Sequence, residues 1–382
     1  MSGDTLPAAD PGLANADERR AAARRILDGH WQPEGYTVPN GHVYPHQWLW
    51  DSCFHAIVWA HLGEAERAVA ELTNVFARQA DDGFVPHMTY WRAPDLHADF
   101  WGRRGASSIT QPPMYGHAIA SLTRLGIEVD RELVERARAG LAFLRARRDR
   151  DGRVVIVHPW ESGCDDSPRW DAWCPAGGWD PVRWKAHKGD LVASLVLDPI
   201  TGSPIGNPRF EVAAAGFEAL VAFNEAELAP LDPPAPTLHD DRPFAPPDVV
   251  ADAPTPARTL EALLGVLVAD PARDRAWLDD TFAAILDPTA FGGECGPAQV
   301  HRAEPAFEPA RYWRGGAWPQ LTYLLWVAAD RLGRTADAAT LASCLVRGAT
   351  RSGFAEHWDP DTGAPGGAVP QTWTTLAAIV AP

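Results

Sequence analysis

The stretch AERAVAELTNVFARQADDGFVPHMTYW, residues 65–91, contains the pattern on which the fold of this chain depends. Its first half repeats apolar residues at positions i, i+3, i+4 and i+7, which predicts a helix with one buried face. Its second half passes from an Asp-Gly turn at Gly83 through a short extended run to His87 and Trp91. The segment GRVVIVHPW, residues 152–160, follows a later helical pattern in the same way. We therefore expect paired helices joined by connectors that carry aromatic and polar residues.

Helical periodicity extends along most of the chain. Residues 134–144 and 321–332 repeat the apolar stripe, and Gly333 is typical of a helix C-terminus. Asn15, with Glu18 three residues later, predicts a capped start for the first helix. About a dozen helices are expected, beginning near residues 15, 48, 64, 110, 130, 187, 208, 256, 273, 316, 336 and 371. This pattern favours a ring of helical hairpins with a site at one end.

The domain organisation follows from length and composition. The chain has 382 residues, of which 46% are hydrophobic, so it can bury a large core. Length alone would allow two or three domains of roughly 100–200 residues each. No segment within residues 15–382 resembles a linker, so we expect one domain there, preceded by a flexible segment over residues 1–14. Residues 230–256 hold nine prolines and predict an irregular surface loop, with a lid over a cleft as the alternative.

Charge and cysteine content indicate the partners and the compartment. With 34 basic and 50 acidic residues, the formal net charge is -16, which disfavours binding to nucleic acid or to a membrane surface. The N-terminal residues lack the pattern of a secretory signal, and no apolar run approaches the roughly 18 residues of a membrane span. The five scattered cysteines predict neither a disulfide framework nor a structural zinc site. We therefore expect a cytoplasmic protein.

Tryptophan is unusually abundant, with 17 residues against 13 phenylalanines and 6 tyrosines. The flat indole face suits stacking on the C–H faces of a sugar ring, although a tryptophan-rich core is the simpler interpretation. Many of these residues stand beside polar neighbours in loop-like segments, such as WLWDS (48–52), SPRWDAW (167–173) and YWRGGAW (312–318). That placement favours a cleft.

Two acidic clusters contain candidate catalytic groups. The first, HPWESGCDDSPRWDAW (158–173), holds Glu161, Asp165, Asp166 and Asp171 among tryptophans. Partial desolvation there would raise a carboxyl pKa and keep a general acid protonated, although a solvated acidic loop fits the composition equally well. The second is GFAEHWDPDTG (353–363), in which Asp359 and Asp361 are expected to serve a tight turn and Glu356 is free for another role. Two such carboxyl groups match the acid and base of glycoside hydrolysis.

Four motifs, in the same order, resemble glycoside hydrolase family 63 and its bacterial glucosylglycerate and mannosylglycerate hydrolase branch, which share a clan with trehalase. They are WLWDS (48–52), ESGxDxSPRWD (161–171), YWRGxxW (312–318) and GFxExxDPxTG (353–363). The resemblance implies an all-α (α/α)6 toroid. It also implies cleavage, with inversion, of a small α-glucoside or α-mannoside resembling glucosylglycerate, mannosylglycerate or trehalose. No bound cofactor is required, although some relatives carry a calcium ion.

The resemblance also implies roles for particular residues. Asp165 matches the general acid and Glu356 the base that activates water, whereas relatives vary at the position of Asp166. The implied substrate contacts are Trp50 and Asp51 on the non-reducing sugar, Gln111 and Glu161 as polar sugar contacts, and Trp313 and Arg314 as the wall and charged support of the site. For each of these six residues, a structural role is the alternative.

The departures from the family pattern concern the aglycone side of the site. Relatives usually carry proline where Gly316 stands, and their F-S-W-T motif reads QTWT at residues 371–374. These changes leave the identity of the sugar and of the aglycone open. The sequence also leaves the oligomeric state open. Arg103, Arg104 and Arg169 are candidates for neutralising an acidic aglycone such as glycerate, with an ordinary surface role as the alternative.

Two other functions compete with glycoside hydrolysis as interpretations of this sequence. A sugar epimerase or phosphorylase on the same toroid, and a non-catalytic sugar-binding protein, are the competing functions. No metal is expected, because His46, His55, His87 and His158 lack metal-ligand spacing. Cys53, at the start of an apolar helix, is predicted to be a buried structural thiol.

Overall fold

The computed structural model describes residues 15–231, 249–250, 253–254 and 257–381. The expected flexible segment 1–14 and most of the proline-rich segment 230–256 lie outside these ranges. The described α-helices are α1 (Ala16–His30), α2 (Leu49–His61), α3 (Ala65–Val75), α4 (Ala98–Trp101), α5 (Tyr115–Arg124), α6 (Arg131–Arg147), α7 (Pro181–Val192), α8 (Ala215–Leu228), α9 (Arg275–Leu286), α10 (Pro319–Arg331) and α11 (Thr335–Ser352). The described 3₁₀ helices are η1 (Pro159–Ser162), η2 (Pro168–Trp173), η3 (Ala229–Leu231), η4 (Leu260–Leu267) and η5 (Thr372–Ala378).

The strands are only two or three residues long and pair antiparallel, two by two. The described pairs are β1 (Trp31–Gln32) with β2 (Tyr36–Thr37), β3 (Gln47–Trp48) with β4 (Met88–Thr89), β5 (Asp149–Arg150) with β6 (Arg153–Val154), β7 (Val196–Leu197) with β8 (Pro204–Gly206), β9 (Val249–Val250) with β10 (Ala253–Pro254), and β11 (His357–Trp358) with β12 (Pro365–Gly366). In register, Gln47 stands opposite Thr89 and His357 opposite Gly366. Strands β4 and β6 lie in the two repeated connectors, which confirms the extended runs expected there.

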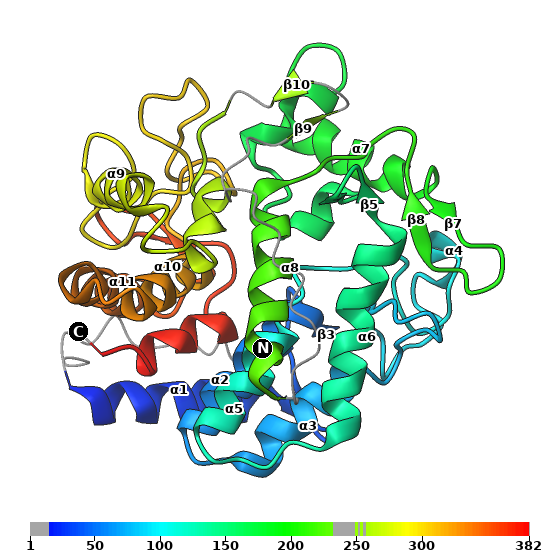
Figure 1. Ribbon diagram of the computed structural model, residues 1–382, viewed down its shortest axis with the longest axis horizontal. Helices are drawn as coiled ribbons and strands as arrows, with labels where there is room; N and C mark the ends of the chain where they lie inside the picture. Colours follow the sequence, from blue (N-terminus) through cyan, green and yellow to red (C-terminus); the bar gives the residue numbers. More distant parts are fainter. Residues whose placement is uncertain (1–14, 232–248, 251–252, 255–256, 382) are drawn as a thin grey trace, which may run out of the picture.

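Six elements close into an inner ring. Helix α2 packs on α5, α5 on α8, α8 on η4, η4 on α10, α10 on η5, and η5 returns to α2. Outer helices cover this ring: α3 packs on α2, α6 on α5 and α8, α9 on η4, α11 on α10, and α1 on η5 (Figure 1). The architecture is the predicted (α/α)6 toroid. The segment between α8 and η4, where the alternation would place a further outer helix, falls largely outside the described residues.

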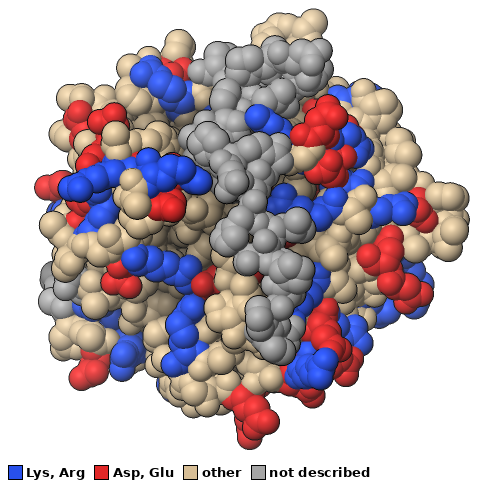
Figure 2. Space-filling model, in the orientation of Figure 1, with Lys and Arg blue, Asp and Glu red and all other residues tan. Residues whose placement is uncertain are grey.

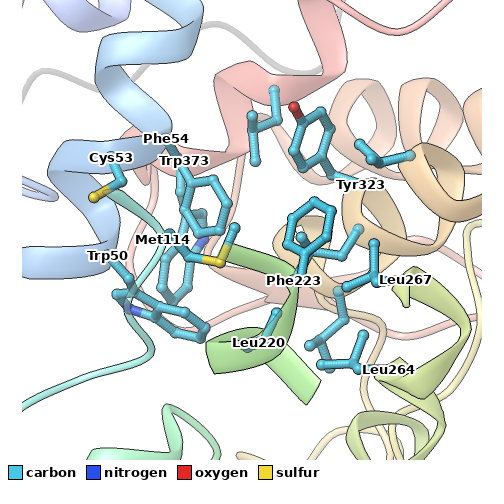
Figure 3. Close-up of a cluster of buried hydrophobic side chains, with 14 of the residues drawn as sticks. Trp50, Cys53, Phe54, Met114, Leu220, Phe223, Leu264, Leu267, Tyr323 and Trp373 are labelled. Carbon is cyan, nitrogen blue, oxygen red and sulfur yellow. The ribbon is translucent and has the colours of Figure 1, made fainter. Parts of the chain in front are cut away.

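The axis of the ring is filled by side chains from α2, α8, η4, α10 and η5 and from Met114, the N-cap residue of α5. Figure 3 shows this cluster, whose labelled members are Trp50, Cys53 and Phe54 of α2, Met114 before α5, Leu220 and Phe223 of α8, Leu264 and Leu267 of η4, Tyr323 of α10, and Trp373 of η5. Removal of their apolar surface from water stabilises the closed ring. The predicted structural thiol is confirmed, because the side chain of Cys53 is fully buried.

Local signals explain where the helices begin. The side chain of Asn15 accepts a hydrogen bond from the Glu18 amide at 2.8 Å, so the predicted cap of α1 is confirmed. Helix α7 begins earlier than predicted, because Asp180 caps it and Pro181 occupies its first turn. Helix α8 begins later than predicted, because Val212 is held in an extended bridge. The predicted start of α5 near residue 110 was also too early, since two prolines precede its first turn.

The surface carries charges of both signs. On the face shown in Figure 2, Lys and Arg side chains are interspersed with Asp and Glu. Among the described helices, none combines the length and the hydropathy that a bilayer crossing requires.

Candidate active site

Three tryptophans bring the first turns of three inner elements together. Trp50 lies in the first turn of α2, Trp318 caps α10, and Trp373 lies in the first turn of η5. The ring of Trp373 is 5.5 Å from that of Trp50 and 6.0 Å from that of Trp318, between ring centroids. The indole N–H of Trp373 donates to the backbone carbonyl of Glu356 at 3.1 Å. The packing of the inner ring therefore positions the segment that carries Glu356.

The Glu356 carboxyl is almost fully buried and held from two sides. Its Oε1 accepts from the hydroxyl of Tyr44 at 2.9 Å, and its Oε2 accepts from the backbone amide of Ala368 at 2.9 Å. Burial raises its pKa to about 6, against the opposing effect of these hydrogen bonds. A carboxyl with this pKa is available as a base near neutral pH.

Asp165 lies between η1 and η2 and is anchored to helix α7. Its Oδ2 is 2.5 Å from the ammonium nitrogen of Lys188, and its backbone carbonyl accepts from the indole N–H of Trp184 at 2.9 Å. Asp166 pairs with the same ammonium group. The side chain of Asp165 is 17% exposed, so it is partly accessible from the site.

The carboxyl groups of Asp165 and Glu356 influence the pKa values of the same neighbouring side chains. The charge of Asp165 contributes to the raised pKa of Glu356, after burial. Burial and then the charge of Glu356 raise the pKa of Tyr44, with a further contribution from Asp165. Burial also raises the pKa of Tyr312, which the charges of Asp165 and Glu356 both influence. Asp165 and Glu356, far apart in sequence, therefore share one electrostatic environment.

Some of the buried polar atoms without a protein hydrogen-bond partner belong to the beginnings of α2, α10 and η5 or to the Trp313–Trp318 stack before α10. These are Asp51 Oδ1, Trp313 Nε1, Trp318 Nε1, Gln320 Nε2 and Oε1, and Gln371 Oε1. A buried polar group left unpaired costs about 1–3 kcal/mol, so a set of them favours a site that binds hydroxyl groups. Burial, followed by the charge of Glu356, raises the pKa of Asp51. Asp51 and Trp313 were predicted as contacts, whereas Trp318, Gln320 and Gln371 were not.

Both carboxylate oxygens of Glu161 have protein partners, which favours the structural role over sugar contact. Its carboxylate forms a paired salt bridge with Arg148, with both N–O distances 3.0 Å, and neither side chain is exposed. The same carboxylate accepts from the amides of Thr110 and Val157 at 3.1 and 2.7 Å. Its oxygens are thus occupied within the fold, where they join the loops before α5 and before η1.

Because the Glu161–Arg148 pair is buried, Glu161→Ala is expected to lower the free energy of unfolding by about 3–5 kcal/mol. The substitution leaves the Arg148 guanidinium buried without its carboxylate. Urea or thermal unfolding measures the effect. The matched control is Glu211→Ala, which removes a partly exposed pair with Arg150 and is expected to cost about 0–1 kcal/mol. Equal losses in the two variants would contradict this interpretation.

The other predicted contacts also have protein partners. Trp50 is 2% exposed and packs against Trp373, and its backbone amide donates to Gln111 Oε1 at 3.4 Å. Trp313 stacks on Trp318 with ring centroids 3.5 Å apart. Arg314 binds Asp171 through two hydrogen bonds of 2.9 and 2.5 Å and lies over the ring of Trp179. These contacts fix the orientation of Trp50 and Arg314 within the fold.

The three arginines proposed for an acidic aglycone are engaged elsewhere. Arg104 forms an exposed ion pair with Asp95, and Arg103 donates to the backbone carbonyl of Arg78. Arg169 donates to the hydroxyl of Thr259 and to a backbone carbonyl. These partners favour structural and surface roles.

In the part of the chain that the structure describes, no three His, Cys, Asp or Glu side chains converge as a metal site would require.

Several residues that the sequence analysis did not single out contribute to this region. Tyr44 and Lys188 contact the two catalytic candidates directly. Tyr312 is the first residue of the YWRG motif, so the motif itself could have identified it. Tyr44 and Lys188 lie in segments without a distinctive motif.

Comparison with known proteins identifies the family. The family model of the mannosylglycerate hydrolase MGH1-like glycoside hydrolase domain matches residues 44–232 and 237–374. The chain belongs to this family. It is therefore a glycoside hydrolase of the family 63 type, as the four motifs predicted, rather than an epimerase or a non-catalytic sugar-binding protein.

Individual members of the glycoside hydrolase family resemble the chain over most of its length. It is 30% identical to the mannosylglycerate hydrolase of Thermus thermophilus, over 90% of this chain and 96% of the relative. It is 29% identical to the glucosylglycerate hydrolase of Mycolicibacterium hassiacum, over 88% of this chain and 92% of the relative. The crystal structure of a family 63 mannosylglycerate hydrolase from Thermus thermophilus, in complex with Tris and D-glycerate, superposes with a TM-score of 0.79 at 28% identity, covering 94% of this chain and 98% of that chain.

Proposed function

We propose that this glycoside hydrolase cleaves a small α-glucoside or α-mannoside with inversion, with Asp165 as the acid and Glu356 as the base. The observation that carries the proposal is that the two carboxyl groups, from distant segments, share one electrostatic environment. The relatives are named for hydrolysis of mannosylglycerate and glucosylglycerate, and these glycosides of glycerate are the substrates we propose first.

The proposed reaction is a single displacement. The protonated carboxyl of Asp165 transfers its proton to the glycosidic oxygen as the bond from that oxygen to the anomeric carbon breaks. The carboxylate of Glu356 takes a proton from a water molecule as the water oxygen bonds to the anomeric carbon from the opposite face. The mechanism requires the two carboxyl groups to stand roughly 6.5–9.5 Å apart, which leaves space for this water.

The remaining polar groups are proposed to orient the sugar. Asp51 Oδ1, the side-chain amide of Gln320 and the side-chain oxygen of Gln371 offer acceptors and a donor without protein partners, which suits sugar hydroxyl groups. Because the surrounding tryptophans are buried and stacked, these groups are held in place before substrate arrives. Orientation of this kind lowers the entropic part of the barrier.

The experiment that tests the proposal combines substrate screening with product stereochemistry. The purified protein is incubated with α-glucosylglycerate, α-mannosylglycerate and trehalose, while proton NMR follows the first anomer released. Release of the β-anomer of the sugar is expected. Initial release of the α-anomer would overturn inversion, and cleavage of none of these small α-glycosides would overturn the proposed substrate class.

Gly367 is expected to be essential for the placement of the base. It has a φ of +71°, and a Cβ there would lie 2.3 Å from Glu356 Oε2. Gly367→Ala should displace this carboxyl and lower kcat/KM by about 100-fold. The matched control is Gly353→Ala, which has a φ of +68° but a nearest contact at 3.9 Å, to Val369. If both variants lose activity equally, backbone strain rather than displacement of Glu356 is responsible.

A further inference from the structure

One ammonium group holds two adjacent carboxyl groups at the acid side of the site. The Nζ of Lys188 lies 2.5 Å from Asp165 Oδ2 and also pairs with Asp166 Oδ1. The side chains of Lys188, Asp165 and Asp166 are only 5%, 17% and 12% exposed. Two carboxylates and one ammonium carry a net charge of −1 in a region with little contact with water. Binding one proton there relieves both the repulsion and the cost of burial.

The groups around this cluster leave the local charge negative. Those that face it are His158, Tyr44, Tyr312, Arg314, Asp171 and Glu356, together with the thiols of Cys164 and Cys174. Arg314 is bound by Asp171, so its positive charge is already balanced. Burial lowers the pKa of His158 to about 3, so this histidine is neutral near pH 7. Glu356, which is electrostatically coupled to Asp165, adds another carboxyl group.

The raised pKa of Asp166 agrees with this charge balance. Burial, followed by the charge of Asp165, raises the pKa of Asp166 to about 6, while the charges of Lys188 and Arg314 oppose the increase. In such a coupled pair the proton belongs to both carboxyl groups together. The geometry therefore favours one exchangeable proton shared by Asp165 and Asp166 over Lys188.

We propose that Asp165, Asp166 and Lys188 form one proton-holding cluster, in which Asp166 and Lys188 are positioning residues with opposite effects. The inference rests on the proposed role of Asp165 as the acid. Before the reaction, the two carboxyl groups share one proton over Lys188, and the negative charge of the second carboxyl keeps that proton bound. When that proton moves to the glycosidic oxygen, Lys188 stabilises the new carboxylate of Asp165 at a contact that already exists.

The pH profile of kcat/KM tests the two positioning roles, with glucosylglycerate and mannosylglycerate as substrates. In Asp166→Asn, Lys188 pairs with Asp165 alone, so the alkaline limb should move to lower pH by about one pH unit or more. In Lys188→Met, two carboxyl groups remain without the cation, so the alkaline limb should move to higher pH by a similar amount. A merely structural role does not produce shifts of opposite sign.

The controls keep the charge changes but move them away from the cluster. Lys185→Met and Asp190→Asn alter exposed positions on the same helix α7 and should leave the alkaline limb at its original pH. Lys188→Arg retains the positive charge and should restore the limb relative to Lys188→Met, which separates charge from packing. Shifts in the same direction for Asp166→Asn and Lys188→Met, or no shift in either, would overturn the proposal.

A direct proton measurement keeps this test independent of turnover. In protein labelled with ¹³C at the aspartate side-chain carboxyl, NMR titration should show one carboxyl of the cluster that titrates above the ordinary aspartate range. This step should disappear in Asp166→Asn and move to higher pH in Lys188→Met. If both carboxyl groups ionise in the ordinary range, the proton-holding cluster is wrong. The titration supports or rejects the cluster even if the proposed substrates are not cleaved.

Discussion

Asp165→Asn is expected to lower kcat on glycosides of glycerate by about 1,000-fold or more, with little change in the unfolding transition. General acid catalysis contributes about 10²–10⁴-fold, and the loss is greatest for a poor leaving group such as an alkoxide. The fold should persist because Lys188 keeps its contact with Asp166. The measurements are steady-state kinetics on the intact glycoside and thermal unfolding of both proteins.

The leaving group separates loss of the acid from general damage. In an α-glycosyl fluoride the leaving group is fluoride, which departs with far less protonation than an alkoxide. Asp165→Asn should therefore retain much of its activity on this substrate. Asp190→Asn removes a carboxylate from an exposed position of helix α7 and serves as the control for charge. Equal losses on the fluoride and on the glycoside of glycerate would show that Asp165 is not the acid.

Glu356→Gln is expected to abolish hydrolysis of both substrates, again by about 1,000-fold or more. Without the carboxylate, no group removes the proton from the attacking water, and a better leaving group does not replace this step. Azide, which carries its own negative charge, should restore turnover on the fluoride and give a glycosyl azide of inverted configuration. Product analysis by NMR measures this rescue, with Glu294→Gln at an exposed ion pair as the control.

The pH dependence of Glu356 has a definite sign. Burial disfavours the charged carboxylate and raises its pKa to about 6, so the base becomes protonated as the pH falls through this value. The acidic limb of kcat/KM in the wild-type protein should therefore lie near pH 6. If the residual activity of Glu356→Gln shows the same acidic limb as the wild-type protein, this limb belongs to another group. That result would contradict the role of Glu356.

Local patterns in the sequence were sufficient for much of the architecture. Apolar spacing predicted helices that the structure contains, and the Asp359 turn is confirmed by hydrogen bonds from the amides of Asp361 and Thr362 at 3.0 and 2.8 Å. Some predicted helix starts were wrong. For example, α7 begins earlier than predicted because Asp180 caps it. Such signals are readable because the interacting groups are only a few residues apart.

The candidate site depended more strongly on long-range packing. The motifs directed attention to Asp165 and Glu356, but the partners of these groups have no signal in the linear pattern. Tyr44 donates to Glu356 across 312 positions, and Lys188 reaches Asp165 from a separate helix. Glu161 shows the reverse effect. It is a motif residue predicted to contact sugar, but its carboxylate forms a buried salt bridge with Arg148.

By itself, the sequence determined the helical periodicity, the four ordered motifs and the two acidic segments that are candidates for catalysis. The closed ring decided which polar groups are satisfied by protein and which are left unpaired at the ends of α2, α10 and η5. The physical reason is that periodicity depends on neighbours three or four residues away, whereas burial, ion pairing and proton affinity depend on every segment that the toroid brings together.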